Sequence, residues 1–338
     1  MADSLKPYLA ALSAGRDLVK DEAVDAFEIL MAGAASQGQM GAFLMGLKAK
    51  GETATEIAAA AQVLRQRCQR VACPPEAIDI VGTGGDRSGS VNVSTAAAFI
   101  VAGLGIPVAK HGNRSITSKA GTADTLEALG VRIDLAHQGA EQCLKEAGIC
   151  FMLAPVYHSA MRHVANVRAE LGVPTIFNLM GPLANPAQVK RLMAGVYDSI
   201  WQRPYAEVLR ELGVERAWIA HGADGLDEIT TTGPTHIVQL RQGDVAQFQV
   251  TPEEAGLARS SAAALKGGSA AENAARLLEL LEGRKSAYRD VAVLNAAGAL
   301  VGVGAETGLA QAARLAEESI DSGRARSALE RLVRASND

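Results

Sequence analysis

A change of hydrophobic pattern at Pro74-Pro75 constrains the fold more than any other feature of this chain. Before the prolines, apolar residues recur every three or four positions, as on amphipathic helices, and no strand pattern occurs. After them, short apolar runs alternate with amphipathic segments, which is typical of a mostly parallel sheet covered by helices. We therefore predict an α/β protein in which a small all-helical N-terminal domain precedes a larger α/β domain with a mostly parallel central sheet.

Individual elements follow from the same patterns. A helix is expected over 54–67 because Thr53 and Glu56 have capping-box spacing. The turn residues Gln242-Gly243-Asp244 predict a hairpin between 235 and 250. The remaining candidates are strands over 78–81, 106–109, 149–153, 192–196 and 218–220, and helices over 96–104, 123–129, 156–171, 269–281, 288–300 and 306–320.

Composition excludes several classes of protein. Lys and Arg total 33 against 37 Asp and Glu, a net charge of -4, which gives no electrostatic reason to expect nucleic acid as a partner. Cys68, Cys73, Cys143 and Cys150 lack metal-ligand spacing and suit reduced thiols in a cytoplasm. No apolar run is long enough to span a bilayer, so we expect a cytoplasmic protein without a membrane partner.

A glycine-rich segment follows the first candidate strand. Gly82-Thr83-Gly84-Gly85-Asp86 comes directly after 78–81, and Asn92-Val93-Ser94-Thr95 then opens a helix. Glycines allow backbone N–H groups to approach phosphate oxygens, and a helix N-terminus adds unpaired donors. The segment matches neither Gly-x-Gly-x-x-Gly in register nor a P-loop, so it indicates a different phosphorylated ligand. The alternative is an ordinary tight turn before a helix cap.

A basic segment follows the second candidate strand. Residues 110–122 combine cations, hydroxyls and glycines before the expected helix over 123–129. Ligands of open α/β sheets bind at the carboxyl ends of strands. Lys110 can act there as a point charge, and Arg114 can fork onto phosphate or onto structural carboxylates. The alternative is a solvated basic loop.

Two adjacent acids, Asp227 and Glu228, follow the candidate strand 218–220. Such pairs are usually solvated, but a diphosphate held on two loops needs charge neutralisation. Mg²⁺ typically binds one or two protein carboxylates together with phosphate oxygens and water. We therefore expect Mg²⁺ at Asp227 and Glu228, with Ser94 contributing from the phosphate side.

The expected helix over 156–171 carries a mixed face. His158, Met161, Ala165 and Arg168 fall within a quarter-turn of one another at 100° per residue. An aromatic acid suits this face, since its ring can take the apolar surface and its carboxylate the guanidinium of Arg168. His158 is equally explained as an ordinary packing or capping histidine.

In their order along nearly the whole chain, these motifs resemble the anthranilate phosphoribosyltransferases of tryptophan biosynthesis, which share the nucleoside phosphorylase/phosphoribosyltransferase fold. Each motif alone is weak, whereas the ordered set is specific. The motifs are Gly82 to Asp86, Asn92-x-Ser94-Thr95, Lys110 to Arg114, Asp124 to Gly130, Thr175 to Asn178 with Gly181-Pro182-Leu183, and Gly225 to Glu228.

The resemblance implies transfer of phosphoribosyl from 5-phospho-α-D-ribose 1-diphosphate to the amine of anthranilate, with release of diphosphate. It also implies a homodimer whose small helical domain comprises 1–72 and an insertion near 168–185, while the remainder of 73–338 forms the α/β domain. The family commonly has Pro at the position of Asn166 and Arg at that of Pro174. We therefore expect the helix leaving the acceptor pocket to pack differently in this chain.

The resemblance also assigns roles to residues. Anthranilate is placed at Gly82, Asn113 and Arg168, beside the His158 of the mixed face, and Mg²⁺ at Ser94, Asp227 and Glu228. We expect Lys110 and Asp86 to assist departure of the diphosphate. Phosphoribosyl diphosphate is assigned to Gly82, Gly85, Asp86, Ser90, Asn92, Val93, Ser94, Thr95, Lys110, His111, Gly112, Asn113, Arg114, Ser115, Ile116, Thr117, Ser118 and Thr122.

Two rival functions remain at this point. A pyrimidine nucleoside phosphorylase shares the fold but has a different glycine loop, and phosphorolysis of thymidine would reveal it. A non-catalytic relative that binds nucleic acid would show steep salt-dependent DNA binding without turnover. The acidic net charge and the intact acidic pair oppose that second function.

Overall fold

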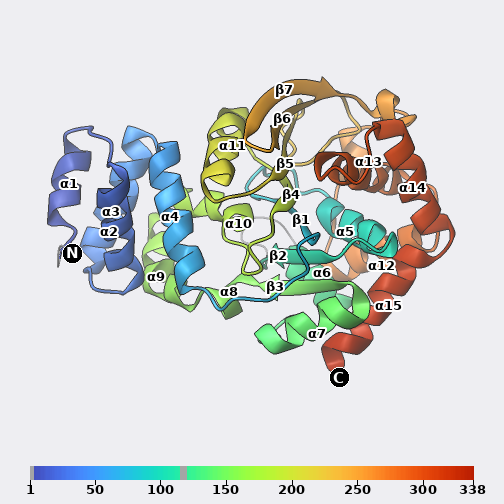
Figure 1. Ribbon diagram of the computed structural model, residues 1–338, viewed down its shortest axis with the longest axis horizontal. Coiled ribbons are helices and arrows are strands. Elements are labelled where there is room, and N and C mark those ends of the chain that lie inside the picture. The colour runs from blue at the N-terminus through green and yellow to red at the C-terminus, as the bar shows by residue number, and fades with distance from the viewer. Residues whose placement is uncertain (1–3, 115–119) are drawn as a thin grey trace.

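A computed structural model describes residues 4–114 and 120–338, which form a small helical lobe beside a larger α/β lobe (Figure 1). The helical lobe begins with α1 (Lys6–Ser13), α2 (Lys20–Met31), α3 (Gln37–Lys50) and α4 (Ala54–Arg67). The predicted combination of a small helical domain and a larger α/β domain is therefore confirmed.

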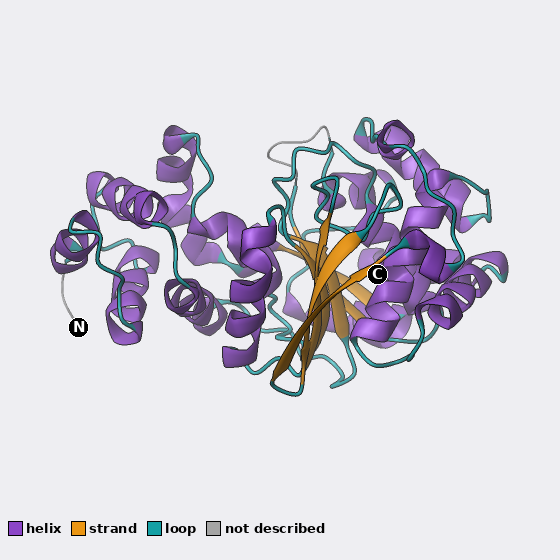
Figure 2. Cartoon of the chain, turned by 90° about the horizontal axis from the view of Figure 1, so that it is seen from above, coloured by secondary structure: helices purple, strands orange, loops and turns teal. Residues whose placement is uncertain are grey.

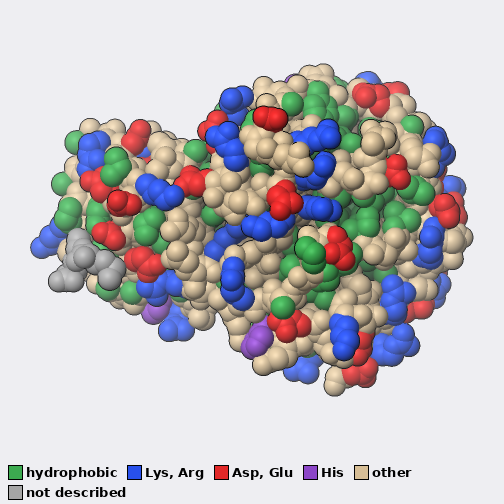
Figure 3. Space-filling view, viewed as in Figure 1, with side chains coloured by type: hydrophobic (Ala, Val, Ile, Leu, Met, Phe, Trp, Pro, Cys, Tyr) green, Lys and Arg blue, Asp and Glu red, His purple; other side chains and the backbone are tan. Residues whose placement is uncertain are grey.

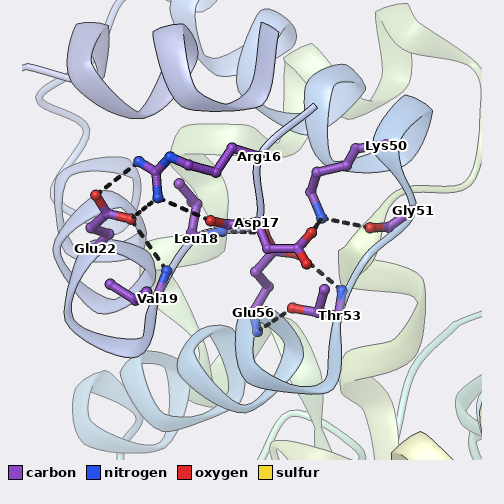
Figure 4. Close-up of polar contacts among 9 residues, drawn as sticks. All are labelled: Arg16, Asp17, Leu18, Val19, Glu22, Lys50, Gly51, Thr53 and Glu56. Carbon is purple, nitrogen blue, oxygen red and sulfur yellow. Dashed lines mark hydrogen bonds and ion pairs between the residues drawn. The ribbon is translucent and has the colours of Figure 1, made fainter. Parts of the chain in front are cut away.

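The capping box predicted at the start of α4 is present and does more than cap a helix. Glu56 accepts the Thr53 N–H at 2.9 Å, and its own N–H donates to Thr53 Oγ1 at 3.3 Å. The same carboxylate accepts the Leu18 N–H at 3.0 Å and pairs with Lys50 at 3.1 Å (Figure 4). Because Glu56 is fully buried, these partners compensate its lost hydration and tie the α1–α2 connection to α3 and α4.

Seven strands form one sheet in the order β3-β2-β1-β4-β5-β6-β7. The first five of these pair in parallel, and the last two form an antiparallel hairpin at one edge, as the turn at Gln242-Gly243 predicted. The strands are β1 (Ile78–Gly82), β2 (Val108–Gly112), β3 (Ile149–Leu153), β4 (Arg191–Gly195), β5 (Arg216–Gly222), β6 (Thr235–Arg241) and β7 (Asp244–Val250).

The position of β2 corrects the sequence prediction. The strand was expected over 106–109, yet it extends to Gly112, so Lys110 and His111 belong to a strand rather than to a loop. They pair with Phe151 and Met152 of β3. The apolar run ends before Lys110, and only the neighbouring strand shows that the backbone stays extended beyond it.

Helices cover both faces of the sheet, which Figure 2 shows nearly edge-on. On one face α5 (Val93–Gly103) packs against β1, and α13 (Ala287–Gly302) against β4 and β5. The other face is covered by α10 (Met180–Leu183) on β1 and α11 (Gln202–Glu211) on β5 and β6. No helix within 4–114 or 120–338 is both long and apolar enough to cross a membrane.

The remaining helices complete the larger lobe. α12 and α14 were predicted, with bounds displaced by up to three residues, whereas α7 and α15 were not. These helices are α6 (Thr122–Ala128), α7 (His137–Ala147), α12 (Ala270–Leu281), α14 (Leu309–Asp321) and α15 (Arg324–Asn337), with short 3₁₀ turns over Ser199–Trp201, Pro252–Ala255 and Ala262–Leu265.

The single helix predicted over 156–171 is wrong. The chain instead forms α8 (Ala154–Tyr157), a 3₁₀ turn over Ser159–Met161 and α9 (Arg162–Leu171). His158 breaks the helix with φ -113° and ψ 59°, and its imidazole packs 5.3 Å from that of His111. Tertiary packing of this buried ring outweighs the local helical preference. α9 runs without interruption through Asn166, and Pro174 lies after its C-cap Gly172.

Contacts between the lobes come from α4 and α2, while α9 joins the helical lobe. Buried Arg65 of α4 donates to the carbonyls of Leu183 at 2.6 Å and Leu212 at 3.4 Å, at the ends of α10 and α11. Lys20 of α2 pairs with Glu211 of α11 at 2.6 Å. α9 packs on α2 and α3, so a segment from the middle of the sequence joins the N-terminal helices.

Candidate active site

One cavity of about 820 Å³ brings together most of the residues that the sequence singled out. Lys and Arg side chains gather near the junction of the two lobes in Figure 3. Thr95 is buried beside the cavity rather than lining it, and Ser115, Ile116, Thr117 and Ser118 lie outside the described residues. The cavity is lined by Gly82, Gly85, Asp86, Ser90, Asn92, Val93, Ser94, Lys110, His111, Gly112, Asn113, Arg114, Thr122, His158, Arg168, Asp227 and Glu228, among others.

The glycine loop at the end of β1 depends on glycine for two reasons. Gly84 and Gly85 have φ of 71° and 85°, a region that other residues rarely adopt. Gly82 has no side chain where a Cβ would lie 2.4 Å from Asp227 Oδ2. This close approach allows the Gly84 N–H to donate to the same carboxylate oxygen at 2.7 Å.

The first turn of α5 faces the same space. The Ser94 N–H donates to Glu228 Oε1 at 3.1 Å, so a carboxylate occupies the anion-binding position at this helix N-terminus. Thr95 donates to Thr122 at 3.2 Å, and Thr125 donates to the Asn92 side chain at 2.7 Å. These contacts join α5 to the start of α6.

Lys110 points from β2 toward β1 and the first turn of α5. Its Nζ donates to the Ile80 carbonyl at 2.5 Å and to Ser94 Oγ at 3.2 Å. The residue is only 2% exposed, and burial lowers the pKa of its ammonium group, while Asp79 and Glu228 oppose that shift. A buried cation beside glycine N–H groups provides a strong local field for an anion.

Burial raises the pKa of both members of the acidic pair. The pKa of Asp227 rises to about 7, with Asp86 as the next cause, and that of Glu228 rises to about 8, with Asp227 as the next cause. Crowded buried carboxylates of this kind gain from a divalent cation, which stabilises their ionised form. The described residues contain no group of three or more His, Cys, Asp or Glu arranged for a metal, so ligand oxygens and water would have to complete a shell.

Arg114 forks onto carboxylates rather than projecting freely. Its guanidinium pairs with Asp124 at 2.8 Å and with Glu127 at 2.8 Å, both on α6. The hydrogen bonds that Arg114 donates to Glu127 are the main reason that the pKa of Arg114 lies above its ordinary value. Of the two roles considered for Arg114, the structure shows the one toward structural carboxylates.

The far end of the cavity has a different character. The Arg168 guanidinium lies 5.4 Å from the Phe177 ring centroid and donates to the Asn178 side chain at 3.5 Å. Burial lowers its pKa, and no carboxylate among the described residues pairs with it. A planar cation beside an aromatic face suits an aromatic carboxylate.

Two buried imidazoles, His111 and His158, line the cavity. Nδ1 of His111 lies 2.8 Å from the Gly181 carbonyl, whereas Nε2 of His111 has no hydrogen-bond partner within the described chain. The Ala184 backbone lies beside His158 and opposes the effect of burial on the pKa of that ring. Burial lowers the pKa of His111 to about 3 and that of His158 to about 4. Both rings are therefore neutral at physiological pH and can offer uncharged donors and acceptors to a ligand.

Several residues at this site were missed from the sequence. Phe177 lies beside Arg168, while Asp79 and Asn185 are buried behind Lys110 and His111. Asp79 had a readable signal, because a charged residue inside a fully apolar strand requires a specific partner. Phe177 lies within the motif Thr175 to Asn178, which was given no site role, and Asn185 had no signal because its position depends on how α10 docks against the sheet.

Comparisons with known proteins agree with this geometry. Residues 74–326 match the α/β domain model of a glycosyl transferase family, and residues 6–68 match its helical bundle domain model. The anthranilate phosphoribosyltransferase of Methylocella silvestris is 55% identical over 335 residues, which cover 99% of this chain and 96% of that protein.

Solved structures give the same result. Anthranilate phosphoribosyltransferase from Thermus thermophilus superposes with a TM-score of 0.92 at 41% identity, covering 98% of this chain and 99% of that one. The enzyme from Saccharomyces cerevisiae in complex with PRPP and Mg superposes with a TM-score of 0.91 at 28% identity, covering 98% of both chains. The same yeast enzyme has also been solved in complex with 4-fluoroanthranilate.

Proposed function

We propose residue roles for this cavity from the premise that the chain belongs to the glycosyl transferase family, among its anthranilate phosphoribosyltransferases. The chain transfers phosphoribosyl from phosphoribosyl diphosphate to the amine of anthranilate, the second step from chorismate to tryptophan. The roles rest on one observation, which is that a single cavity joins an anion-binding end to an aromatic, cationic end.

At the anion-binding end, we assign the diphosphate to the backbone of Gly82 to Asp86, the first turn of α5 and Lys110. Displacement at the anomeric carbon develops negative charge on the leaving group, so fixed N–H donors and a buried cation stabilise the transition state. Asp86 lies beside Asp227, whose pKa it raises, and therefore belongs to the charge balance of the metal site. Arg114 is anchored to α6 through its carboxylate partners Asp124 and Glu127.

Mg²⁺ is the cofactor that the donor set fits. Asp227, Glu228 and Ser94 supply hard oxygen atoms, and the yeast relative has been solved with PRPP and Mg. When bound, Mg²⁺ supplies positive charge to the leaving diphosphate. The buried, raised-pKa state of the acidic pair supports this assignment, because a cation relieves the repulsion between these carboxylates.

At the other end, Arg168 receives the carboxylate of anthranilate, Phe177 contacts its ring, and neutral His158 lies near the ring as an uncharged group. We assign Asn113 and the backbone at Gly82, which line the same cavity, to both substrates. An aromatic amine is unprotonated at neutral pH, so positioning its nitrogen suffices and no general base is required.

A fluorescence assay tests this function directly. Anthranilate fluorescence should fall when the purified chain is mixed with phosphoribosyl diphosphate and Mg²⁺, and chelation of the metal should stop the fall. Thymidine with phosphate serves as the control, since turnover there instead would indicate a nucleoside phosphorylase. Absence of any change with anthranilate would overturn the proposed roles.

We also propose the assembly, the domain limits and the location. The helical domain comprises 1–72 with the later insertion, which is supported by the packing of α9 on α2 and α3 and of Phe177 on Phe27 at 6.2 Å. Four free cysteines suit a cytoplasmic setting. A homodimer is expected from the family resemblance. Light scattering after size-exclusion chromatography would measure the molar mass and so the oligomeric state.

A further inference from the structure

The sheet is interrupted directly behind the active site. β1 pairs with β2 only at Ile78 opposite Val108, whereas β1–β4 and β2–β3 each pair along 5 residues. The Ile78 N–H donates to the Pro107 carbonyl at 2.9 Å, which fixes the register of the two strands. A regular parallel ladder would continue by joining the Ile80 N–H to the Ala109 carbonyl and the Ile80 carbonyl to the His111 N–H.

Side chains occupy the positions of the missing ladder bonds. The Ile80 carbonyl accepts from Lys110 Nζ at 2.5 Å, and the His111 N–H donates to Asp79 Oδ1 at 3.4 Å. The Ala109 carbonyl, which faces β1, accepts from Asn185 Nδ2 at 2.8 Å. Buried backbone groups must be paired, and these side chains give the Ile80 carbonyl, the His111 N–H and the Ala109 carbonyl the partners that the parted strands do not supply.

Asp79 and Asn185 are also bonded to each other. Asn185 Nδ2 donates to Asp79 Oδ2 at 2.7 Å, and Asn185 Oδ1 accepts the Ala187 N–H at 2.8 Å. Both residues are at most 1% exposed, and neither lines the cavity. We call Asp79 and Asn185 the polar wedge.

The polar wedge lies behind residues of both ends of the cavity. Lys110 reaches Ser94 at the anion-binding end because β2 diverges from β1. His111, held through its N–H by Asp79, faces Gly181 and His158 at the other end. Asn185 follows α10, which carries the Gly181 carbonyl that lies against His111.

We propose that Asp79 and Asn185 are positioning residues of the transferase reaction, which hold β1 and β2 apart so that Lys110 faces the anion-binding end of the cavity and His111 faces the acceptor end. The inference rests on the role proposed above for Lys110 and on the place of His111 in the cavity lining. Asp79 and Asn185 touch no substrate themselves. Their loss should therefore weaken both ends of the cavity together, unlike a change at either end alone.

Asp79→Asn and Asn185→Ala test this directly. Asp79→Asn places an amide where two donors require acceptors, and Asn185→Ala removes the donor to Asp79 and Ala109. We expect kcat/KM to fall by about a hundredfold for each substrate, because a displacement of about 1 Å at a reacting group has that effect. Unchanged kcat and KM values in either folded variant would overturn the proposal.

Gln202→Met is the matched control. Gln202 is also buried and bridges strand carbonyls, donating to Ile219 at 2.7 Å and His236 at 2.8 Å, but it lies outside the cavity. The Gln202→Met variant should lower the melting temperature without changing kcat or either KM at a temperature where the protein is folded. An equal loss of activity in Gln202→Met would show that the wedge variants report general destabilisation.

A double-mutant cycle separates positioning from mere stability. If Asp79 acts through Lys110, adding Asp79→Asn to Lys110→Met should cost less than about threefold in kcat/KM for phosphoribosyl diphosphate. If the two substitutions acted independently, their fold losses in kcat/KM would multiply, and that result would contradict the proposal. Wild-type turnover in the same assay distinguishes failure of this inference from failure of the proposed function.

Discussion

The two ends of the cavity differ in how far the protein satisfies its own polar groups. At the anion-binding end, Asp227 accepts a hydrogen bond from the Gly84 N–H and Glu228 accepts one from the Ser94 N–H. Lys110 donates to the Ser94 hydroxyl. At the acceptor end, Arg168 has no carboxylate partner and Nε2 of His111 has no hydrogen-bond partner among the described residues. The first end is held in place by its own network, whereas the second leaves its polar groups open to a ligand.

This difference suits the chemistry of each substrate. A diphosphate and its metal ion carry large charges, and preorganised dipoles stabilise a changing charge without reorganisation during the reaction. Anthranilate is a small aromatic acid, and open polar groups beside an apolar wall determine its orientation. Substitutions at the anion-binding end should therefore lower kcat, and those at the acceptor end should raise KM for anthranilate.

The largest effect is expected for Glu228→Gln. Loss of one charge from the acidic pair should lower kcat/KM by about a thousandfold, as for removal of a principal electrostatic group. Activity measured across a Mg²⁺ titration should also show a higher cation requirement. Asp244→Asn, on the exposed hairpin, should retain wild-type kinetics. Normal activity of Glu228→Gln at low Mg²⁺ would show that the pair is not a metal site.

Gly195→Ala tests the close packing that holds the anion-binding end together. A Cβ at Gly195 would lie 1.5 Å from the Asp227 carbonyl oxygen, so the backbone must move. We expect the free energy of unfolding to fall by about 3 kcal/mol. Gly233→Ala meets no atom within 4 Å and should change stability little, which chemical denaturation can measure. Equal stability of the two variants would contradict the packing argument.

Arg168→Ala tests the acceptor end. Loss of a charge-assisted hydrogen bond worth about 2 kcal/mol should raise KM for anthranilate about thirtyfold, with KM for phosphoribosyl diphosphate unchanged. Arg168→Lys should not restore the wild-type KM for anthranilate, because lysine lacks the planar guanidinium that can bind a carboxylate through two hydrogen bonds. Arg203→Ala, exposed on α11, is the control. An unchanged KM for anthranilate in Arg168→Ala would place the acceptor elsewhere.

The effect that is smallest per unit change in conditions concerns pH and His158. Burial lowers its pKa in the folded state to about 4, below the ordinary 6.5, so between these values the unfolded chain binds more protons. The free energy of unfolding therefore falls as pH falls, by about 1.4 kcal/mol per unit from this residue. His158→Asn should remove that part of the slope relative to wild type, whereas exposed His236→Gln should not. Identical slopes for wild type and His158→Asn would refute the buried, neutral state.

Much of the fold could be read from the sequence because it depends on local periodicity. The helix over 54–67, the strand before Gly82 and the hairpin at Gln242-Gly243 all occur where apolar spacing and turn residues placed them. The break at His158 and the extension of β2 to Gly112 could not be read. Both depend on partners distant in the sequence, which are His111 for the imidazole and β3 for the strand.

The sequence by itself determined the chemistry available to this protein, namely a glycine loop, a lysine, an acidic pair and an arginine in a fixed order. Tertiary structure alone decided how these groups meet. The parting of β1 from β2 around Asp79 and Asn185 directs Lys110 and His111 into the cavity. Residue types and loop spacing are properties of the chain, whereas a gap between two strands exists only once both strands and α10 have packed together.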